Sequence, residues 1–403
     1  ELIDTSVQVG DQIRIGERYE QAYSSQTPVK GTFLADASSI AVASSVTVGR
    51  NGGDGVLRLG SSSLTVSDSI RIGQNTTIYT GSESSYTSSS ISKGSLVVTD
   101  QSTITTEYVE IGGTKFSQGD GVFTDSTLNT KSLTVAGGSF DENEASSFVI
   151  GATGSLIMEN STVNMVSSGS DDIGVFIVGQ TNDASGNVVF NGSEINGIRY
   201  MEIGGDRNTD DNIGGRGTVT FNDSSIVQRS SETPDQYQRF NAVIGREGGV
   251  GEVSLNNSSF TTIVDSQISG SDSYFYTGWH VGRHNSDQTS GAEYDGVLNV
   301  DNSQLTISNE GLGNADIYFT IAARGSARGY AEFLNGSSLT ISSNNVAAIE
   351  SGISVSARPD TYGKFVVDAS TVTISGAAML NSVQIGNRGA GDMEITNGGS
   401  MIV

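Results

Sequence analysis

The sequence contains no cysteine and only 3 prolines among its 403 residues. Without cysteine there is no disulfide framework, so the fold must draw its stability from a packed core. The scarcity of proline favours hydrogen-bonded strands, because a proline inside a sheet removes a ladder donor. No stretch approaches the ~18 consecutive apolar residues of a membrane-spanning helix, so the sequence predicts no transmembrane segment.

Positive charge is also scarce. Lys and Arg total 21 against 45 Asp and Glu, which gives a formal net charge of −24 at pH 7. Nucleic acids and anionic membrane surfaces both attract basic patches, and this composition offers no sign of one. We therefore expect no nucleic-acid partner and a solvated surface that attracts cations.

Glycine, in contrast, is abundant, with 52 residues, and it marks a repeat. Residues 46–73 begin with Val-Thr-Val-Gly and end with Ile-Arg-Ile-Gly, with two further apolar-polar-apolar triplets between these phrases. Such period-two alternation, interrupted by Gly, Ser, Asn and Asp, is typical of short strands with one buried face. The stretch therefore predicts three short strands per repeat.

Three phrases recur along the whole chain in a fixed order. The second phrase begins with glycine, as in "GVLRL" from Gly55, and the third begins with serine, as in "SSLTV" from Ser62. The first phrase is an apolar triplet that ends on a glycine, with degenerate copies near Ala323 and Ala357, and its glycines are Gly16, Gly49, Gly73, Gly112, Gly151, Gly179, Gly204, Gly245, Gly282 and Gly386.

This internal period indicates a solenoid, because one coil is too thin to bury both faces and must stack its apolar residues on neighbouring coils. We predict an all-β fold, a right-handed parallel β-helix of about twelve coils with three short strands each; right-handedness follows from the usual hand of parallel connections. Glycine permits the positive φ of a tight corner, and Asn or Asp tolerates the left-handed region. We therefore interpret the asparagines of the Asn-x-Ser and Asn-x-Thr triplets as turn residues rather than glycosylation sites.

The order of the three phrases resembles the β-strand repeats of bacterial autotransporter passengers and related large surface adhesins, which likewise run from a Val-Gly or Ile-Gly corner through "GTVTV"-like strands. The resemblance covers nearly the full length. It implies a right-handed β-helix at the bacterial cell surface, associated with the outer membrane or secreted, that serves adhesion, aggregation or biofilm formation. The serine-protease signature "GDSGS" of some members is missing from this sequence.

We expect residues 1–403 to form a single β-helix domain that is a fragment of a longer chain, because both ends fall inside repeat phrases. Coil lengths vary, and the excess residues are expected in loops that leave the helix, where solenoids often bind their partners. The larger insertions lie near 74–93, 205–216, 228–241 and 264–295.

One insertion suggests a metal site. The stretch "DRNTDDN" offers side-chain oxygens at alternate positions, a spacing that Ca²⁺ loops use for their first ligands. The full helix-loop-helix motif fails, because it would need Gly at Asp211 and Glu at Gly217. A looser calcium loop and a merely solvated turn both remain open, and the candidate calcium ligands are Asp206, Asn208, Asp210 and Asp211.

Aromatic residues and both histidines, His280 and His284, gather in the last insertion. Exposed Tyr and Trp rings could stack on sugars or anchor a protein partner. The competing interpretation is that Trp279, the first residue of "WHVG", points into the core and that the tyrosines cap it. The candidate ligand-binding residues are Tyr274, Tyr276, Trp279 and Tyr294.

From these features we predict a non-enzymatic adhesin or structural rod that contacts a glycan or protein of a host or neighbouring cell, or copies of itself. The main alternative is a polysaccharide lyase or hydrolase, since such enzymes also use β-helices. Hydrolysis needs two carboxylates across one bond, and no cluster of acid, base and aromatic recurs on neighbouring repeats. A self-assembling envelope-layer protein is a third reading.

Overall fold

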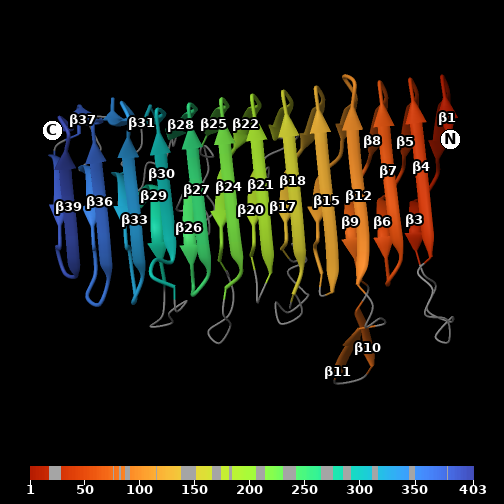
Figure 1. The fold of residues 1–403 in the computed structure, drawn as a ribbon, viewed down its shortest axis with the longest axis horizontal. Helices are drawn as coiled ribbons and strands as arrows, with labels where there is room; N and C mark the ends of the chain where they lie inside the picture. Colours follow the sequence, from red (N-terminus) through yellow and green to blue (C-terminus); the bar gives the residue numbers. More distant parts are fainter. Residues whose placement is uncertain are drawn as a thin grey trace.

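The computed structural model describes residues 1–17, 29–75, 77–80, 83–86, 91–114, 116–137, 151–165, 174–180, 184–205, 214–229, 242–264, 276–284, 292–310, 316–344, 350–378 and 380–403. These residues form no helix and fold into three parallel sheets, one for each sequence phrase. Successive strands of a sheet come from successive coils, so the chain is a three-sided parallel β-helix of about twelve coils with its termini at opposite ends (Figure 1). At ~4.8 Å per coil the rod is ~60 Å long.

The first sheet collects the first phrase in 12 strands. In order these are β3 (Ile13–Glu17), β6 (Val46–Arg50), β9 (Ser69–Gln74), β14 (Tyr108–Ile111), β17 (Ser132–Val135), β20 (Val175–Val178), β23 (Tyr200–Ile203), β26 (Ala242–Arg246), β29 (Tyr276–Arg283), β32 (Asp316–Ile321), β35 (Glu350–Val355) and β38 (Leu380–Ile385).

The second sheet collects the glycine-initiated phrase in 13 strands. They are β1 (Leu2–Ile3), β4 (Lys30–Asp36), β7 (Asp54–Gly60), β12 (Ser92–Thr99), β15 (Ser117–Thr124), β18 (Thr153–Glu159), β21 (Ser185–Asn191), β24 (Arg216–Asn222), β27 (Val250–Asn256), β30 (Gly296–Asp301), β33 (Arg328–Leu334), β36 (Tyr362–Asp368) and β39 (Ala390–Thr396).

The third sheet collects the serine-initiated phrase, also in 13 strands. They are β2 (Ser6–Val9), β5 (Ser39–Val42), β8 (Ser63–Val66), β13 (Thr103–Thr105), β16 (Thr127–Thr130), β19 (Thr162–Met165), β22 (Glu194–Ile198), β25 (Ser225–Arg229), β28 (Ser259–Val264), β31 (Gln304–Asn309), β34 (Ser338–Ser343), β37 (Thr371–Gly376) and β40 (Ser400–Ile402).

The apolar residues of all three phrases point inward and form one hydrophobic cluster that runs from Ile15 to Ile374. Leu57 and Leu59 of β7 are 2% and 0% exposed, as the alternation predicts, whereas Arg58 between them is exposed. Aromatic rings continue the stack in the middle coils, where Phe190 and Phe221 lie parallel with centroids 5.1 Å apart. Burial of these side chains supplies the main stabilisation of the rod.

The glycines of the repeat allow neighbouring coils to touch backbone to backbone. Gly245 closes β26 with a φ of 69°, and a Cβ there would lie 1.9 Å from the carbonyl oxygen of Asp295 in the next coil. A Cβ on Gly251, at the start of the second phrase, would lie 2.0 Å from the carbonyl oxygen of Ile203. Glycine at Gly245 and Gly251 therefore leaves the space that the backbone of the neighbouring coil occupies.

The serines of the third phrase form a buried ladder. The backbone N–H of Ser193 donates to Oγ of Ser224 over 3.1 Å, and that of Ser224 donates to Oγ of Ser258 over 3.0 Å. The Ser224 hydroxyl in turn donates to the carbonyl of Asn222 over 2.8 Å. Serine thus satisfies a buried N–H at a corner that no strand ladder reaches.

The corner that precedes these serines uses Asn as a turn residue, as predicted. Asn160, Asn257 and Asn335, each the first residue of an Asn-x-Ser or Asn-x-Thr triplet, have φ values of 47°, 50° and 54°. The amides of Asn222 and Asn256 lie at the end of their second-sheet strands and bond to each other over 2.8 Å across coils. The asparagines therefore stabilise corners and connect neighbouring coils.

The prediction that Gly151 ends a first phrase is wrong. The coil that follows β14 closes at Ala136, which has a φ of 52°, and β17 pairs with β14 and β20 in register. The phrase ending at Gly151 therefore does not supply the first-sheet strand of this coil. An alanine in the left-handed conformation forms this corner, so the sequence has no glycine there to mark the end of the first phrase.

The outer face of the first sheet is more buried than simple alternation implies. Its outward residues Thr134, Glu202 and Val243 are 3%, 0% and 0% exposed. Val243 belongs to a second apolar cluster with Val175, Ile177 and Tyr200, separate from the main core. The first sheet is thus packed on both faces over its middle strands.

The predicted insertions fall largely between the strands of the three sheets. Within 74–93 the chain forms an antiparallel hairpin of β10 (Thr77–Thr80) and β11 (Glu83–Tyr86), which projects from the rod in Figure 1. The stretch 264–295 also contains β29, whose eight residues continue the first sheet. None of the described residues forms a helix with the length and apolar character needed to cross a bilayer.

Candidate functional site

The four predicted calcium ligands, Asp206, Asn208, Asp210 and Asp211, lie outside the described residues, as does Tyr274. Tyr276 begins β29 and pairs with Asp316 of β32, but only its backbone is described. In the part of the chain that is described, no group of three or more metal-binding side chains comes together. The calcium site therefore stays a prediction from the sequence.

Trp279 lies in the core. Its side chain is 0% exposed, and its ring meets Phe260 edge to face with centroids 4.7 Å apart. Its indole Nε1 donates a hydrogen bond of 2.9 Å to Oγ1 of Thr262. The buried ring with a satisfied polar atom agrees with the interpretation of Trp279 as a core residue.

Tyr294 lies on the outside and belongs to a row of three tyrosines. Its ring centroid is 5.2 Å from that of Tyr330 and 6.3 Å from that of Tyr362. Tyr330 and Tyr362 come from β33 and β36, so the three rings stand on successive coils at the second sheet. All three are partly exposed. We call these three residues the tyrosine row.

Carboxylates accompany this row. The Tyr362 hydroxyl donates to Asp392 over 2.9 Å, and the Tyr330 hydroxyl donates to Glu332. The hydrogen bond to Asp392 raises the pKa of Tyr362 to about 12, while burial and then the hydrogen bond to Glu332 raise the pKa of Tyr330. Both phenols are therefore neutral at physiological pH, and the row combines aromatic faces with acceptor oxygens.

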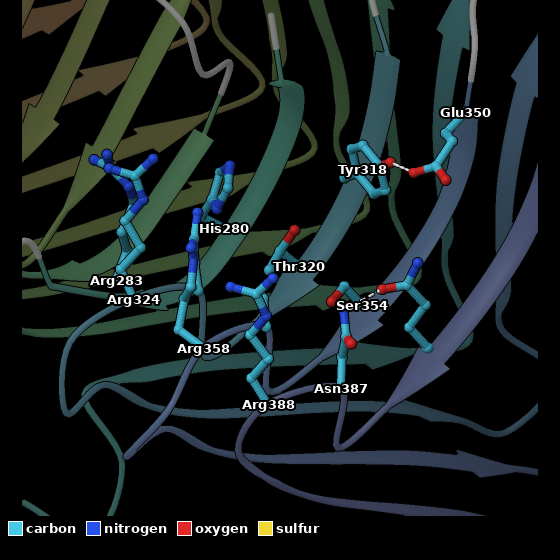
Figure 2. A pocket seen from close by; sticks show the side chains of 13 residues that line it. His280, Arg283, Tyr318, Thr320, Arg324, Glu350, Ser354, Arg358, Asn387 and Arg388 are labelled. Carbon is cyan, nitrogen blue, oxygen red and sulfur yellow. Dashed lines mark hydrogen bonds between the residues drawn. The ribbon is translucent and has the colours of Figure 1, made fainter. Parts of the chain in front are cut away.

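A groove of about 270 Å³ lies over the last four strands of the first sheet, β29, β32, β35 and β38, and the turns that follow them (Figure 2). Polar and positively charged side chains predominate in its lining. The lining residues are His280, Arg283, Tyr318, Thr320, Ala323, Arg324, Glu350, Ser354, Ala357, Arg358, Gln384, Asn387 and Arg388. We call this cavity the arginine groove.

The floor of the arginine groove is one row across the sheet. His280 pairs in register with Thr320, Thr320 with Ser354, and Ser354 with Gln384. In the preceding coil the same row holds Val243, which belongs to the apolar cluster. From His280 onward the described residues of this row are all polar, and the groove begins there.

Three arginines reach the groove from equivalent corners. Ala322, Ser356 and Gly386 have φ values of 58°, 62° and 64°, so each turns the chain in the same way. The second residue after each corner is an arginine, namely Arg324, Arg358 and Arg388. Equivalent corners on successive coils place these three arginines in line along the groove, at about the ~4.8 Å spacing of parallel strands.

A fourth arginine, Arg283, ends β29 and is 6% exposed. Burial, followed by repulsion from Arg246 and Arg324, lowers the pKa of its guanidinium to about 10. Burial and the positive charges of Arg283, Arg324 and Arg246 also hold the pKa of His280 well below its usual value. His280 is therefore neutral at pH 7, and both shifts arise partly from a local positive field.

The charge of the groove is not balanced by its own carboxylate. Among the described residues of the lining, Glu350 is the one acidic residue, and it accepts a hydrogen bond from the Tyr318 hydroxyl (Figure 2). Arg324, Arg358 and Arg388 are exposed and form no ion pair with any carboxylate of the described residues. These three exposed arginines thus gather in one groove of a chain whose net charge is −24.

Arg246, one coil before Arg283, shows the contrasting arrangement. Its Nη1 lies 3.1 Å from Oε2 of Glu202, which is fully buried, and 3.3 Å from the Tyr200 hydroxyl. Burial opposes the charge of Arg246, but the surrounding Glu202, Tyr200 and Glu247 outweigh it and raise its pKa. Arg246 is neutralised inside the fold, whereas the exposed arginines of the groove are available to a ligand.

Sequence reasoning missed the arginine groove. The signal was present as "AAR", "SAR" and "GNR", which end at Arg324, Arg358 and Arg388 in three consecutive repeats. Two of these corners lack glycine, so the common register of the arginines was not visible. Only the stacked coils bring together side chains that are 30 or more residues apart in the sequence.

The fold defines the class of protein, a parallel β-helix with three sheets. Comparison with protein-family models, with curated proteins and with solved structures found no match to this chain. The tyrosine row and the arginine groove are the two surfaces from which we infer a function.

Proposed function

We propose that this chain is a non-enzymatic adhesin rod, located at a bacterial cell surface or secreted, that attaches to glycans or proteins of neighbouring cells. The observation that carries this proposal is the tyrosine row, three partly exposed rings on successive coils in which Tyr294 contacts both Tyr330 and Tyr362. Aromatic faces next to carboxylates suit the apolar faces and hydroxyl groups of sugars. The resemblance of the repeats to autotransporter passengers supports the same location and role.

The rod itself contributes rigidity. A single hydrophobic cluster connects the coils along almost the whole length, so each coil is held by its neighbours. A surface row on such a rod keeps its ring spacing without a ligand, which lowers the entropic cost of binding. Attachment then depends on a preformed surface.

The test is attachment of the purified rod to immobilised glycans and to bacterial cells. We expect the Tyr330→Ala, Tyr362→Ala double variant to lose about tenfold or more in retention, since truncation of an aromatic hot spot at a binding surface costs ~2 kcal/mol or more. Tyr108→Ala is the matched control, because Tyr108 is an exposed tyrosine of β14, outside the row. Equal retention of all variants, or no retention by the natural chain, would refute the proposal.

The same samples discriminate the two alternatives. Chromatography of the glycans after incubation would reveal shortened or unsaturated products if the chain were a polysaccharide hydrolase or lyase. Light scattering of the rod alone would reveal growing particles if its ligand were a second copy of itself, as in an envelope layer.

A further inference from the structure

We propose that the arginine groove binds an acidic oligosaccharide, with Arg324, Arg358 and Arg388 holding its carboxylate or sulfate groups. The inference rests on the proposed function, because it names the class of ligand that such a rod would hold at this second surface. It depends on a different sheet and on different residues from the tyrosine row.

The positive charge of the groove favours an anionic ligand. Three exposed guanidinium groups recur on successive coils and form no ion pair with a described carboxylate, while the rest of the chain is strongly acidic. Like charges gathered in this way repel one another, and an anionic ligand would relieve that repulsion. Guanidinium groups also match the planar, two-oxygen geometry of carboxylate and sulfate groups.

The three arginines are regularly spaced. The arginines stand on parallel coils, so their spacing along the rod is close to the ~4.8 Å between parallel strands. A ligand with acidic groups at regular intervals can therefore engage one arginine per coil. A linear acidic oligosaccharide has this regular arrangement, whereas a single small anion would engage only part of the row.

The size of the groove and its neutral polar residues favour a saccharide. The groove of about 270 Å³ exceeds the space of one inorganic anion, and Thr320, Ser354, Gln384 and Asn387 offer neutral donors and acceptors for sugar hydroxyls. A single-stranded nucleic acid would favour aromatic stacking platforms. In the part of the lining that the structure describes, the one aromatic residue is Tyr318, which is 7% exposed and hydrogen-bonded to Glu350. This composition favours a saccharide over a nucleic acid.

The experiment is isothermal titration of the purified chain with oligogalacturonate, which carries carboxylates, a heparin-derived oligosaccharide, which carries sulfates, and a neutral N-acetylated chito-oligosaccharide. Free sulfate and a single-stranded oligonucleotide are titrated as competing anions. We expect one of the two acidic probes to bind and the neutral probe not to bind. Each change of Arg324, Arg358 or Arg388 to Gln should weaken binding about tenfold, since it removes a charge-assisted hydrogen bond to the ligand. The triple variant with all three changes should no longer bind the acidic probe. Lysine at the same positions should weaken it less, because it keeps the charge but loses the two-pronged contact.

The matched control is Arg58→Gln. It removes the same charge from an exposed position of β7 on the second sheet, away from the groove. We expect it to bind the acidic probe as the natural chain does. Because the three groove arginines are exposed, the variants should keep the circular dichroism spectrum and melting temperature of the natural chain.

Four results would overturn the inference: no binding of either acidic probe, undiminished binding by a folded triple variant, equally tight binding of free sulfate, or tighter binding of a single-stranded oligonucleotide. The outcome is separable from that of the proposed function. Oligogalacturonate or heparin-derived binding without attachment to any surface would defeat the adhesin proposal alone. Attachment through the tyrosine row without acidic-probe binding would defeat the groove assignment alone.

Discussion

His280 illustrates how one residue of a repeated phrase acquires a distinct role. The middle position of the first phrase varies between coils, with Thr, Glu or Val in some of them, and here it holds a histidine that is 6% exposed beside three arginines. Burial and those charges keep its pKa well below the usual ~6.5. The fold therefore resists protonation of this side chain.

This lowered pKa predicts a pH dependence of stability. Below pH ~6.5 the unfolded chain binds a proton at this histidine and the folded chain does not, so stability falls as the pH falls, by up to ~1.4 kcal/mol per pH unit. His280→Gln should flatten this decline between pH 7 and pH 5, as measured by urea unfolding. The control is the same comparison between pH 7 and pH 8, where the two proteins should have equal slopes; equal slopes below pH 6 would contradict the assignment.

Ser224 represents the buried serine ladder. Replacing it with alanine leaves the N–H of Ser193 without its acceptor in a buried corner. We expect Ser224→Ala to lower the free energy of unfolding by ~1–3 kcal/mol. Ser225→Ala is the control, because Ser225 is exposed and adjacent, and it should change stability by less than ~0.5 kcal/mol. A similar loss in both variants would show that the ladder contributes nothing specific.

At the scale of the element, the corner glycines carry two separate constraints, which substitutions can separate. Gly245 combines a positive φ with a neighbouring carbonyl 1.9 Å from where a Cβ would be, whereas Gly336 has a φ of 82° and no atom within 4 Å of that position. Gly336→Ala should therefore cost only the left-handed strain of ~1–2 kcal/mol.

Gly245→Ala should cost that strain plus a clash of ~1–3 kcal/mol, because backbone cannot move aside as a flexible side chain can. The melting temperatures of the two variants, each compared with that of the natural chain, separate backbone strain from the steric clash. If Gly336→Ala were as damaging as Gly245→Ala, backbone conformation alone would explain the glycine repeat.

The elements were largely predictable, because each phrase encodes its own strand. Period-two alternation identified the buried residues of β7, and the fixed order of phrases gave three parallel sheets and about twelve coils. The assignment failed where the local signal was degenerate, as at Ala136, which occupies a corner without being glycine. Sequence alternation also did not reveal that outward residues such as Glu202 are buried, since that depends on what packs over the sheet.

The candidate site was less predictable than the fold. Tyr294 was identified from the local density of aromatics, but its partners Tyr330 and Tyr362 lie one and two coils further on and became neighbours only through stacking. The arginine groove arises in the same way from three distant corners. Register between coils, which single phrases do not encode, determines both surfaces.

At the scale of the whole molecule, the net charge of −24 causes electrostatic repulsion between copies of the rod. Self-repulsion keeps strongly charged proteins apart at low ionic strength, and salt screens it over a length of ~10 Å at 0.1 M. Divalent cations can additionally bridge carboxylates. Adhesion between copies should therefore depend on the ionic conditions more than on any single contact.

We predict that ~2 mM CaCl₂, relative to EDTA, raises the melting temperature and the particle size, because a ligand that binds only the folded state stabilises it. NaCl at matched ionic strength separates screening from binding, since it reproduces the relief of self-repulsion but not the binding of a divalent cation. We therefore expect CaCl₂ to raise the melting temperature more than NaCl does. If the acidic insertion binds calcium, Asp206→Asn with Asp210→Asn should abolish the rise in melting temperature. Asp4→Asn with Asp125→Asn, which removes the same charge from two exposed corners, should preserve it. An unchanged melting temperature in the natural chain would exclude the predicted calcium site and leave repulsion between acidic surfaces as the sole control of self-association.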